Sequence, residues 1–120
     1  KQSRAICGLS MGGFHTLYIT LNNPDMFGYS GMFSAAIGVS DASVSPMYQD
    51  FDQKLATYFS KKPSLLWIGC GDTDFLIQAN REFVQKLNDN KYPHEYLEND
   101  GGHIWRNWRI YLTEFVPKLF

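Results

Sequence analysis

The chain has 120 residues, of which 44% are hydrophobic and 16% are aromatic, a composition that can form a packed core and that excludes an intrinsically disordered chain. The formal net charge of −1 gives no electrostatic reason to expect a nucleic acid or an anionic membrane as a partner. No stretch approaches the roughly 18 consecutive apolar residues that a membrane-spanning helix requires, so we expect no membrane contact.

The first predicted strand is a short apolar run at 3–7, and it leads directly into the motif Gly8-Leu9-Ser10-Met11-Gly12. A helix is predicted at 12–21, where apolar residues recur at helical spacing. Gly-x-Ser-x-Gly between a strand and a helix is typical of a nucleophile elbow, in which the two glycines permit a tight turn that exposes the serine hydroxyl. We therefore predict Ser10 as a nucleophile and the Met11 backbone N–H, at the helix N-terminus, as a donor to an oxyanion. The alternative is an ordinary glycine-rich turn with a capping serine.

The middle of the chain carries fewer functional signals. A second, buried strand is predicted at 29–33, followed by a loop rich in Ser, Ala and Gly at 34–46 and a helix at 47–60. Three residues of this region are candidates for lining a pocket, which the sequence does not decide: Asp41, Tyr48 and Phe51.

A third strand is predicted at 64–70, and Gly71-Asp72-Thr73-Asp74 follows it at once. A helix is predicted from about 75 to 87, with Thr73 or Asp74 as its cap. Asp72 and Asp74 both lie where the acid partner of a histidine is needed. Asp100 is a third candidate, which we interpret as a turn residue.

A fourth strand is predicted at 92–97, with the mixed polar character of an edge strand. Asp100-Gly101-Gly102-His103 follows in a loop, and a closing helix is predicted at 104–120, where Pro117 disturbs only the end. His103 is the predicted general base, carried on a flexible glycine hinge; the alternative is a solvated loop histidine. The other two histidines are predicted at the surface: His15 in the first helix and His94 on the last strand.

Strands that alternate with helices indicate an α/β fold, here a parallel sheet of about four strands with helices on both faces. Ligands bind such sheets at the carboxyl ends of the strands. Ser10, Asp74 and His103 each lie just past the end of a predicted strand, so we expect them to converge there. Their chain order is that of α/β-hydrolases and differs from the trypsin-like and subtilisin-like orders.

The two cysteines, Cys7 and Cys70, end the first and third predicted strands. If one strand lies between them, two spacings of about 4.8 Å separate them by about 10 Å, whereas a disulfide tolerates at most about 7 Å between Cα atoms. We therefore predict two buried, free thiols. No Cys/His/Asp cluster has metal-ligand spacing and no glycine-rich loop suits a nucleotide phosphate, so we expect neither a metal nor a cofactor.

Three segments together carry a resemblance to a known family: Arg4–Gly13, Leu66–Leu76 and Gly101–Arg109. They resemble the esterase D-like α/β-hydrolases, most closely the feruloyl and acetyl-xylan esterases of polysaccharide-degrading bacteria. Enterochelin esterases and S-formylglutathione hydrolase are similar at a greater distance. The resemblance covers almost the whole chain and is weakest between 38 and 62.

The resemblance implies roles for individual residues. The family's Gly-x-x-Asp pattern, which here begins at Gly71, selects Asp74 over Asp72. Ser10, Asp74 and His103 would then form a catalytic triad in which Asp74 orients the imidazole and stabilises its charged form. Apart from the resemblance, Trp105 lies close to the loop that carries His103 and is a candidate for an aromatic wall beside an acyl group; the alternative is core packing of the last helix. We interpret Trp108 as core packing of the last helix.

The resemblance also implies a domain organisation. The family's catalytic domain has a central sheet of about eight strands, with the nucleophile after the fifth, so 1–120 would be a single partial domain: the C-terminal half, starting at the nucleophile strand. A second oxyanion donor would then lie outside the chain, and a catalytically incompetent fragment is one alternative function. The open edge of the strand at 3–7 predicts that such a fragment self-associates.

The implied function is a serine carboxylesterase that acts through an acyl-enzyme on feruloyl or acetyl esters of plant cell-wall polysaccharide. Alternatives with the same triad are a siderophore esterase, a thioesterase and an acyltransferase. The expected partner is thus a small-molecule or polysaccharide ester, without nucleic acid or membrane, and a polysaccharide esterase would be secreted or periplasmic.

Overall fold

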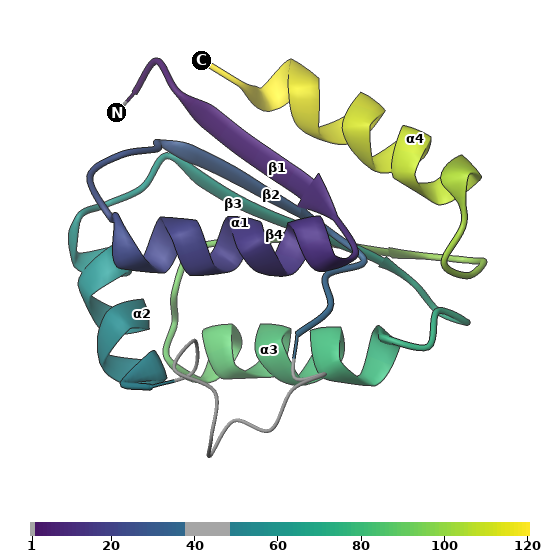
Figure 1. The fold of residues 1–120 in the computed structure, drawn as a ribbon, viewed down its shortest axis with the longest axis horizontal. Coiled ribbons are helices and arrows are strands. Elements are labelled where there is room, and N and C mark those ends of the chain that lie inside the picture. Colours follow the sequence, from purple (N-terminus) through teal and green to yellow (C-terminus); the bar gives the residue numbers. More distant parts are fainter. Residues whose placement is uncertain (1, 38–48) are drawn as a thin grey trace.

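The computed structural model describes residues 2–37 and 49–120. Within these residues four strands alternate with four α-helices (Figure 1). In chain order the elements are β1 (Ala5–Leu9), α1 (Met11–Asn22), β2 (Tyr29–Phe33), α2 (Phe51–Ser60), β3 (Leu65–Gly71), α3 (Ile77–Asp89), β4 (Glu95–Asn99), α4 (Trp105–Phe115) and the 3₁₀-helix η2 (Val116–Lys118). No helix among the described residues is long and apolar enough to cross a membrane.

The four strands form one parallel sheet in the order β1-β2-β3-β4. Helices α1, α2 and α3 cover one face and α4 covers the other, as Figure 1 shows. The predicted α/β fold, with a four-stranded parallel sheet between helices, is therefore confirmed. Because all four strands run in the same direction, the loops after β1, β2, β3 and β4 all emerge at the same end of the sheet, where the strands have their carboxyl ends.

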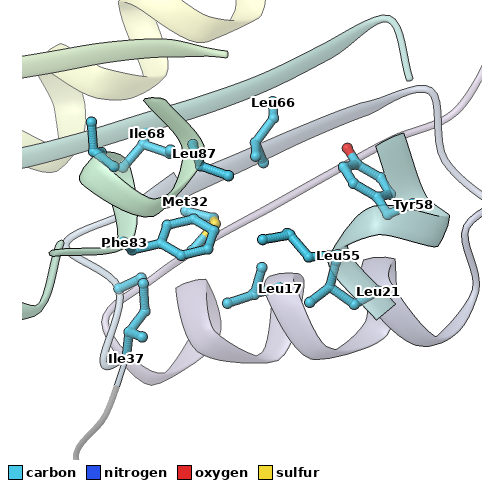
Figure 2. Packing of buried hydrophobic residues seen from close by; sticks show 12 residues of the cluster. Leu17, Leu21, Met32, Ile37, Leu55, Tyr58, Leu66, Ile68, Phe83 and Leu87 are labelled. Atoms are coloured by element: carbon cyan, nitrogen blue, oxygen red, sulfur yellow. The ribbon is translucent and has the colours of Figure 1, made fainter. Parts of the chain in front are cut away.

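The larger core lies between the sheet and the helices α1, α2 and α3 (Figure 2). Successive strand residues point to opposite faces, so Met32 and the pair Leu66 and Ile68 face this core. The helices contribute mainly leucine and aromatic side chains: Leu17 and Leu21 from α1, Leu55 and Tyr58 from α2, and Phe83, Val84 and Leu87 from α3. Burying each such aliphatic or phenylalanine side chain contributes about 1.5–3 kcal/mol, so this face supplies most of the driving force for folding.

The opposite face is a smaller, aromatic core under α4. Phe33 and Trp67, the strand neighbours of Met32 and Ile68, meet Tyr111 and Phe115 of α4 there. The Phe33 and Trp67 rings are in edge contact, with centroids 5.6 Å apart. The spacing of Tyr111 and Phe115 by four residues places both on the buried side of the helix. This packing holds the second half of α4 against the sheet.

The start of helix α2 differs from the prediction. α2 begins at Phe51 and not at 47, because Asp50 has a left-handed backbone (φ 55°) that an α-helix cannot include. Asp41 and Tyr48, two of the pocket candidates, lie outside the described residues. The third, Phe51, packs against the core on α2 beside Phe83, away from the carboxyl ends of the strands.

The predictions for the cysteines are correct on pairing and half correct on burial. Both thiols are free, with β2 between their strands, and Cys70 is fully buried. Cys7, in contrast, is exposed. Cys7 lies on the outer strand β1, on the face that α4 covers, and α4 packs over β2 and β3 and leaves that part of β1 open. The expectation that this open edge pairs with a second copy stays a prediction.

Candidate active site

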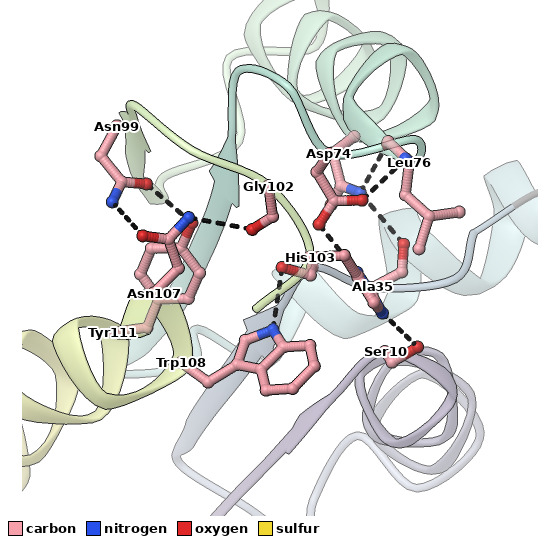
Figure 3. A network of polar contacts seen from close by, with 12 residues as sticks. Ser10, Ala35, Asp74, Leu76, Asn99, Gly102, His103, Asn107, Trp108 and Tyr111 are labelled. Carbon is pink, nitrogen blue, oxygen red and sulfur yellow. Dashed lines mark hydrogen bonds and ion pairs between the residues drawn. The ribbon is translucent and has the colours of Figure 1, made fainter. Parts of the chain in front are cut away.

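Ser10 occupies the turn between β1 and α1 in a strained backbone conformation. Its φ is 55° and its ψ is −120°, a region that costs a non-glycine residue of the order of 1–3 kcal/mol. Backbone hydrogen bonds hold it there: its N–H donates to Phe33 O (2.8 Å), and its carbonyl accepts from Gly13 N (3.0 Å) and Ala36 N (2.9 Å). The loop after β2 thus fixes the turn, and the Ser10 side chain points out beyond the strand ends (Figure 3).

The two glycines of the motif have different roles. A Cβ on Gly8 would lie 2.3 Å from the carbonyl oxygen of Gly12, so the strand and the first turn of α1 approach too closely for any side chain there. A Cβ on Gly12 would meet nothing within 4 Å. The expectation that the tight turn needs a glycine at both positions is therefore wrong for Gly12: its backbone blocks a side chain on Gly8, but a side chain on Gly12 itself would have room.

This difference predicts opposite outcomes for two alanine substitutions. Gly8→Ala is expected to lower the free energy of unfolding by at least about 3 kcal/mol, the upper range for overpacking, because the atom it meets is backbone. Gly12→Ala is expected to leave it unchanged or raise it by up to about 1 kcal/mol, since alanine favours the helix. Thermal and urea unfolding followed by circular dichroism would measure both, and equal losses would contradict this account of the turn.

His103 connects the serine to a carboxylate. Its Nε2 lies 3.0 Å from Ser10 Oγ and its Nδ1 lies 2.8 Å from Asp74 Oδ2, so the hydroxyl donates to Nε2 while the Nδ1–H donates to the carboxylate (Figure 3). The three residues come from the loops after β1, β3 and β4. The structure thus brings together all three side chains that were predicted to meet at the carboxyl ends of the strands.

Asp74 is 2% exposed and uses its two oxygens for different partners. Oδ1 accepts from the backbone N–H of Leu76 (2.8 Å), and Oδ2 faces His103. The Asp74 carbonyl also accepts from Ile77 N (3.0 Å), which closes a turn just before α3. The carboxylate therefore caps the turn and orients the imidazole at the same time. Because this turn takes up the residues after Asp74, α3 begins at Ile77, two residues later than predicted.

The competing acids lie elsewhere. Asp72 accepts from the backbone N–H of Gly101 (3.2 Å) at the surface and thereby joins the loops after β3 and β4. Asp100 is exposed and lies beside Arg106, with 3.9 Å between its carboxylate and the guanidinium. The Gly-x-x-Asp pattern from the family resemblance and the geometry of the structure agree on Asp74 as the partner of His103.

The Met11 backbone N–H is placed to donate to a negative charge beside Ser10. Met11 is the first residue of α1, and the first N–H groups of a helix have no acceptor within it. The positive end of the helix dipole lies at the same point. A negatively charged oxygen that forms next to Ser10 would be stabilised there.

Aromatic rings surround His103. The exposed ring of Phe75 and the half-buried indole of Trp108 both make edge contacts with the imidazole, each with centroids 5.0 Å apart. Trp108 also packs against the aromatic core, as predicted, and its indole N–H donates to Ser34 Oγ (3.1 Å). Trp108 therefore has a second contact that its interpretation as a core residue did not include.

Trp105 packs against Trp108, which in turn contacts the His103 imidazole. It is 68% exposed and makes an edge contact with Trp108 (5.0 Å between centroids). With Trp108 it lines an apolar groove of about 340 Å³ between α4 and the outer strand β1, which also includes Leu9, Phe33 and Leu112. The predicted aromatic wall thus borders a groove whose other side is formed by the strand that leads to Ser10.

The buried thiol of Cys70 does not compete with Ser10 as a nucleophile. Burial, with a further contribution from the nearby Asp74 and Glu98 carboxylates, raises its pKa to about 12. It therefore stays protonated at neutral pH, and a protonated thiol is a weak nucleophile.

Of the two remaining histidines, His15 is exposed on α1 as predicted. His94 precedes β4 and is half-buried, so the prediction that it is exposed is wrong; its Nδ1 lies 2.7 Å from Tyr92 O. In the described part of the chain, no group of three His, Cys, Asp or Glu residues could hold a metal ion.

Comparison with known proteins places this chain in a family. The model of the family described as "Putative esterase" matches residues 1–119. The chain belongs to this esterase family. The endo-1,4-β-xylanase/feruloyl esterase of Xylanibacter ruminicola is 31% identical over 121 residues, which are 100% of this chain and 15% of that protein. The acetyl esterase of Caldicellulosiruptor saccharolyticus is 26% identical over 140 residues, covering 94% of this chain and 53% of that protein.

A solved structure of a similar protein has the same fold as this chain. A ferulic acid esterase superposes with a TM-score of 0.76 at 27% sequence identity, over 97% of this chain and 50% of that one. The chain therefore spans about half the length of this structure and of the acetyl esterase.

Three residues near Ser10, Asp74 and His103 were missed in the sequence. Phe75 directly follows Asp74, and its ring is 75% exposed. This exposure distinguishes it from a core residue, and the sequence does not show it. Ser34 is fully buried with a positive φ of 48°, which no sequence pattern indicates. Asn107 is different, because it shares the buried helix face of Tyr111 and Phe115 at a spacing of four. A polar residue at such a position needs a buried partner.

Proposed function

We propose that this chain carries the catalytic triad of a serine carboxylesterase, with Ser10 as nucleophile, His103 as general base and acid, and Asp74 as the group that orients His103. The observation that carries the proposal is the continuous hydrogen-bonded chain from Ser10 Oγ through both imidazole nitrogens to the buried Asp74 carboxylate. A nucleophile, a base within hydrogen-bond reach and a third group that orients the base are the geometric requirements for this chemistry.

In the first half of the reaction, Ser10 Oγ attacks the ester carbonyl carbon while its proton passes to His103 Nε2. The carbonyl π electrons move to the oxygen, and the Met11 N–H stabilises the negative charge that forms there. When the tetrahedral intermediate collapses, the bond to the leaving alcohol breaks. The alcohol oxygen takes the proton from Nε2, and the acyl group stays on Ser10.

In the second half, water attacks the acyl-enzyme carbonyl and gives its proton to Nε2. The second tetrahedral intermediate then releases the carboxylic acid, and Ser10 Oγ recovers the proton. In both halves Asp74 stabilises the imidazolium and keeps Nδ1 protonated, so that Nε2 is free to accept. The fixed Leu76 N–H on the other Asp74 oxygen prevents the carboxylate from turning away.

For the substrate we propose feruloyl or acetyl esters of plant cell-wall polysaccharide. The names of the two relatives, a xylanase/feruloyl esterase and an acetyl esterase, support this choice. The aromatic side chains of Phe75 and Trp105 around the site suit a flat phenolic acyl group, which stacks favourably on exposed rings. Incubation with feruloylated and acetylated xylan, with chromatography of the released acids, would test this choice; release of neither acid would contradict it.

The triad itself is tested by covalent labelling. A fluorophosphonate is expected to phosphonylate the native, full-length protein at Ser10 alone, with one adduct per chain and a parallel loss of p-nitrophenyl acetate hydrolysis. Intact-mass and peptide mass spectrometry would locate the adduct. Labelling at another residue, or hydrolysis that continues after complete labelling, would contradict the assignment of Ser10 and not the choice of substrate.

A further inference from the structure

The carbonyl groups of the two glycines before His103 are both held by hydrogen bonds. Gly101 O accepts from Thr73 N (3.0 Å) in the loop after β3. Gly102 O accepts from the side-chain Nδ2 of Asn107 on α4 (3.0 Å), a bond drawn in Figure 3. The predicted flexible hinge is therefore wrong, since the segment that carries His103 is anchored on two sides.

Asn107 is fully buried and lies in the centre of a polar network. Its Oδ1 accepts from Asn99 Nδ2 (3.0 Å) and from the Arg106 guanidinium (3.3 Å), while its Nδ2 donates to Gly102 O. The side-chain amide of asparagine has both an acceptor oxygen and N–H donors, so Asn107 can accept from Asn99 and donate to Gly102 O at the same time. A carboxylate would keep the acceptor and lose the donor.

Tyr111 extends the network along the buried face of α4. Its hydroxyl donates to Asn99 Oδ1 (2.7 Å), and this bond fixes the orientation of the Asn99 amide so that Asn99 Nδ2 faces Asn107. Burial, with a contribution from nearby Cys70 and Asp74, raises the pKa of Tyr111, so its hydroxyl remains a donor at neutral and moderately alkaline pH. The network thus connects the end of β4, the buried face of α4 and the residue that precedes His103.

We infer that Asn107 is a positioning residue for the proposed esterase reaction, which holds the imidazole of His103 at hydrogen-bond distance from both Ser10 and Asp74 through the backbone of Gly102. The inference rests on the proposed function. His103 has to meet two partners at 3.0 and 2.8 Å, and a displacement of about 1 Å at a reacting group can lower the rate about 100-fold. The Gly102 carbonyl belongs to the peptide that joins Gly102 to His103, and besides Asn107 it accepts only from Ile104 N (3.0 Å) among the printed bonds of the described residues. We therefore expect loss of the Asn107 donor to displace the imidazole.

The test uses Asn107→Asp in the native, full-length protein, with ethyl acetate and p-nitrophenyl acetate as substrates that share an acyl group. We expect kcat to fall about 10- to 100-fold, with KM changed by less than about threefold. We also expect kcat/KM to fall more for ethyl acetate, because ethanol must be protonated by the displaced imidazole whereas p-nitrophenolate leaves without a proton. Tyr111→Phe, which removes only the outer hydroxyl, should show the same pattern with a smaller loss.

The matched control is Thr20→Val, which removes a buried side-chain hydrogen bond to Ser30 (3.1 Å) at the opposite end of the sheet. It should lower Tm and leave the kinetic constants of both substrates unchanged. If Asn107→Asp behaves like this control, or if its losses are equal for both esters, the inference is wrong. Should Asn107→Asp fail to fold, Tyr111→Phe with native kinetics would overturn it equally. A Ser10→Ala variant that still hydrolyses both esters would instead refute the proposed function.

Discussion

Replacement of Ser10 by alanine is expected to lower kcat for ester hydrolysis by about four to six orders of magnitude. The hydroxyl is the atom that attacks the carbonyl carbon in the proposed reaction, and alanine offers no other nucleophile. The fold should survive, because the side-chain hydrogen bond of Ser10 is to His103, and the backbone contacts that hold the turn remain. Steady-state hydrolysis of p-nitrophenyl acetate, with Tm measured in parallel, would show whether activity is lost without unfolding.

A control for this experiment is Ser60→Ala. Ser60 is an exposed serine at the end of α2, where its hydroxyl donates to Thr57 O, and its loss should leave kcat within about twofold of native. Retention of more than a few per cent of native activity by Ser10→Ala would exclude the acyl-enzyme mechanism. Loss of activity in the control would point to general damage.

Asp74→Asn is expected to lower kcat by about 10⁴-fold, the effect of the same change in a serine–histidine–aspartate triad. The new side-chain amide can present its NH₂ to His103 Nδ1, which then accepts, so that the proton moves to Nε2 and the nitrogen facing Ser10 can no longer act as a base. The substituted side chain keeps its size, and its oxygen can still accept from Leu76 N. We therefore expect KM to change little and the turn before α3 to stay in place.

Asp72→Asn is the matched control, two residues away in the same loop. The Asp72 carboxylate accepts from the Gly101 N–H at the surface, and an asparagine oxygen can accept this bond as well. Its kcat should stay within about threefold of native. The ratio of kcat between the two variants is the quantity to measure, and a ratio near one would show that the hydrogen bond from His103 to Asp74 does not matter for catalysis.

Much of the fold follows from local patterns in the sequence. The strand at 29–33 and the helix that carries Leu17 and Leu21 were predicted nearly to the residue, because hydrophobic periodicity and burial agree there. That Ser10, Asp74 and His103 lie close together could be predicted because a parallel sheet brings the carboxyl ends of its strands to one end of the sheet, which is a property of topology and needs no side-chain geometry. The choice between Asp72 and Asp74 required the family resemblance.

The remaining features depend on contacts between distant segments. The exposure of Cys7 follows from where α4 lies across the sheet, and no property of the strand itself determines it. The late start of α3 follows from the use of Asp74 as an acceptor for its own loop. The two glycines before His103 indicated flexibility, whereas Asn107 and Thr73, which lie on other elements of the fold, hold their carbonyl groups in place.

The contrast between the fixed residues of the proposed triad and the exposed side chains around them has a consequence for how such a protein can specialise. Buried groups that belong to the sheet ends and to α4 hold Ser10, Asp74 and His103, whereas the side chains of Phe75 and Trp105 are largely exposed beside them. Replacement of either exposed ring disturbs no buried hydrogen bond of the triad. For the proposed function, we therefore expect single surface changes at these two rings to alter the preferred acyl group while Ser10, Asp74 and His103 stay in place.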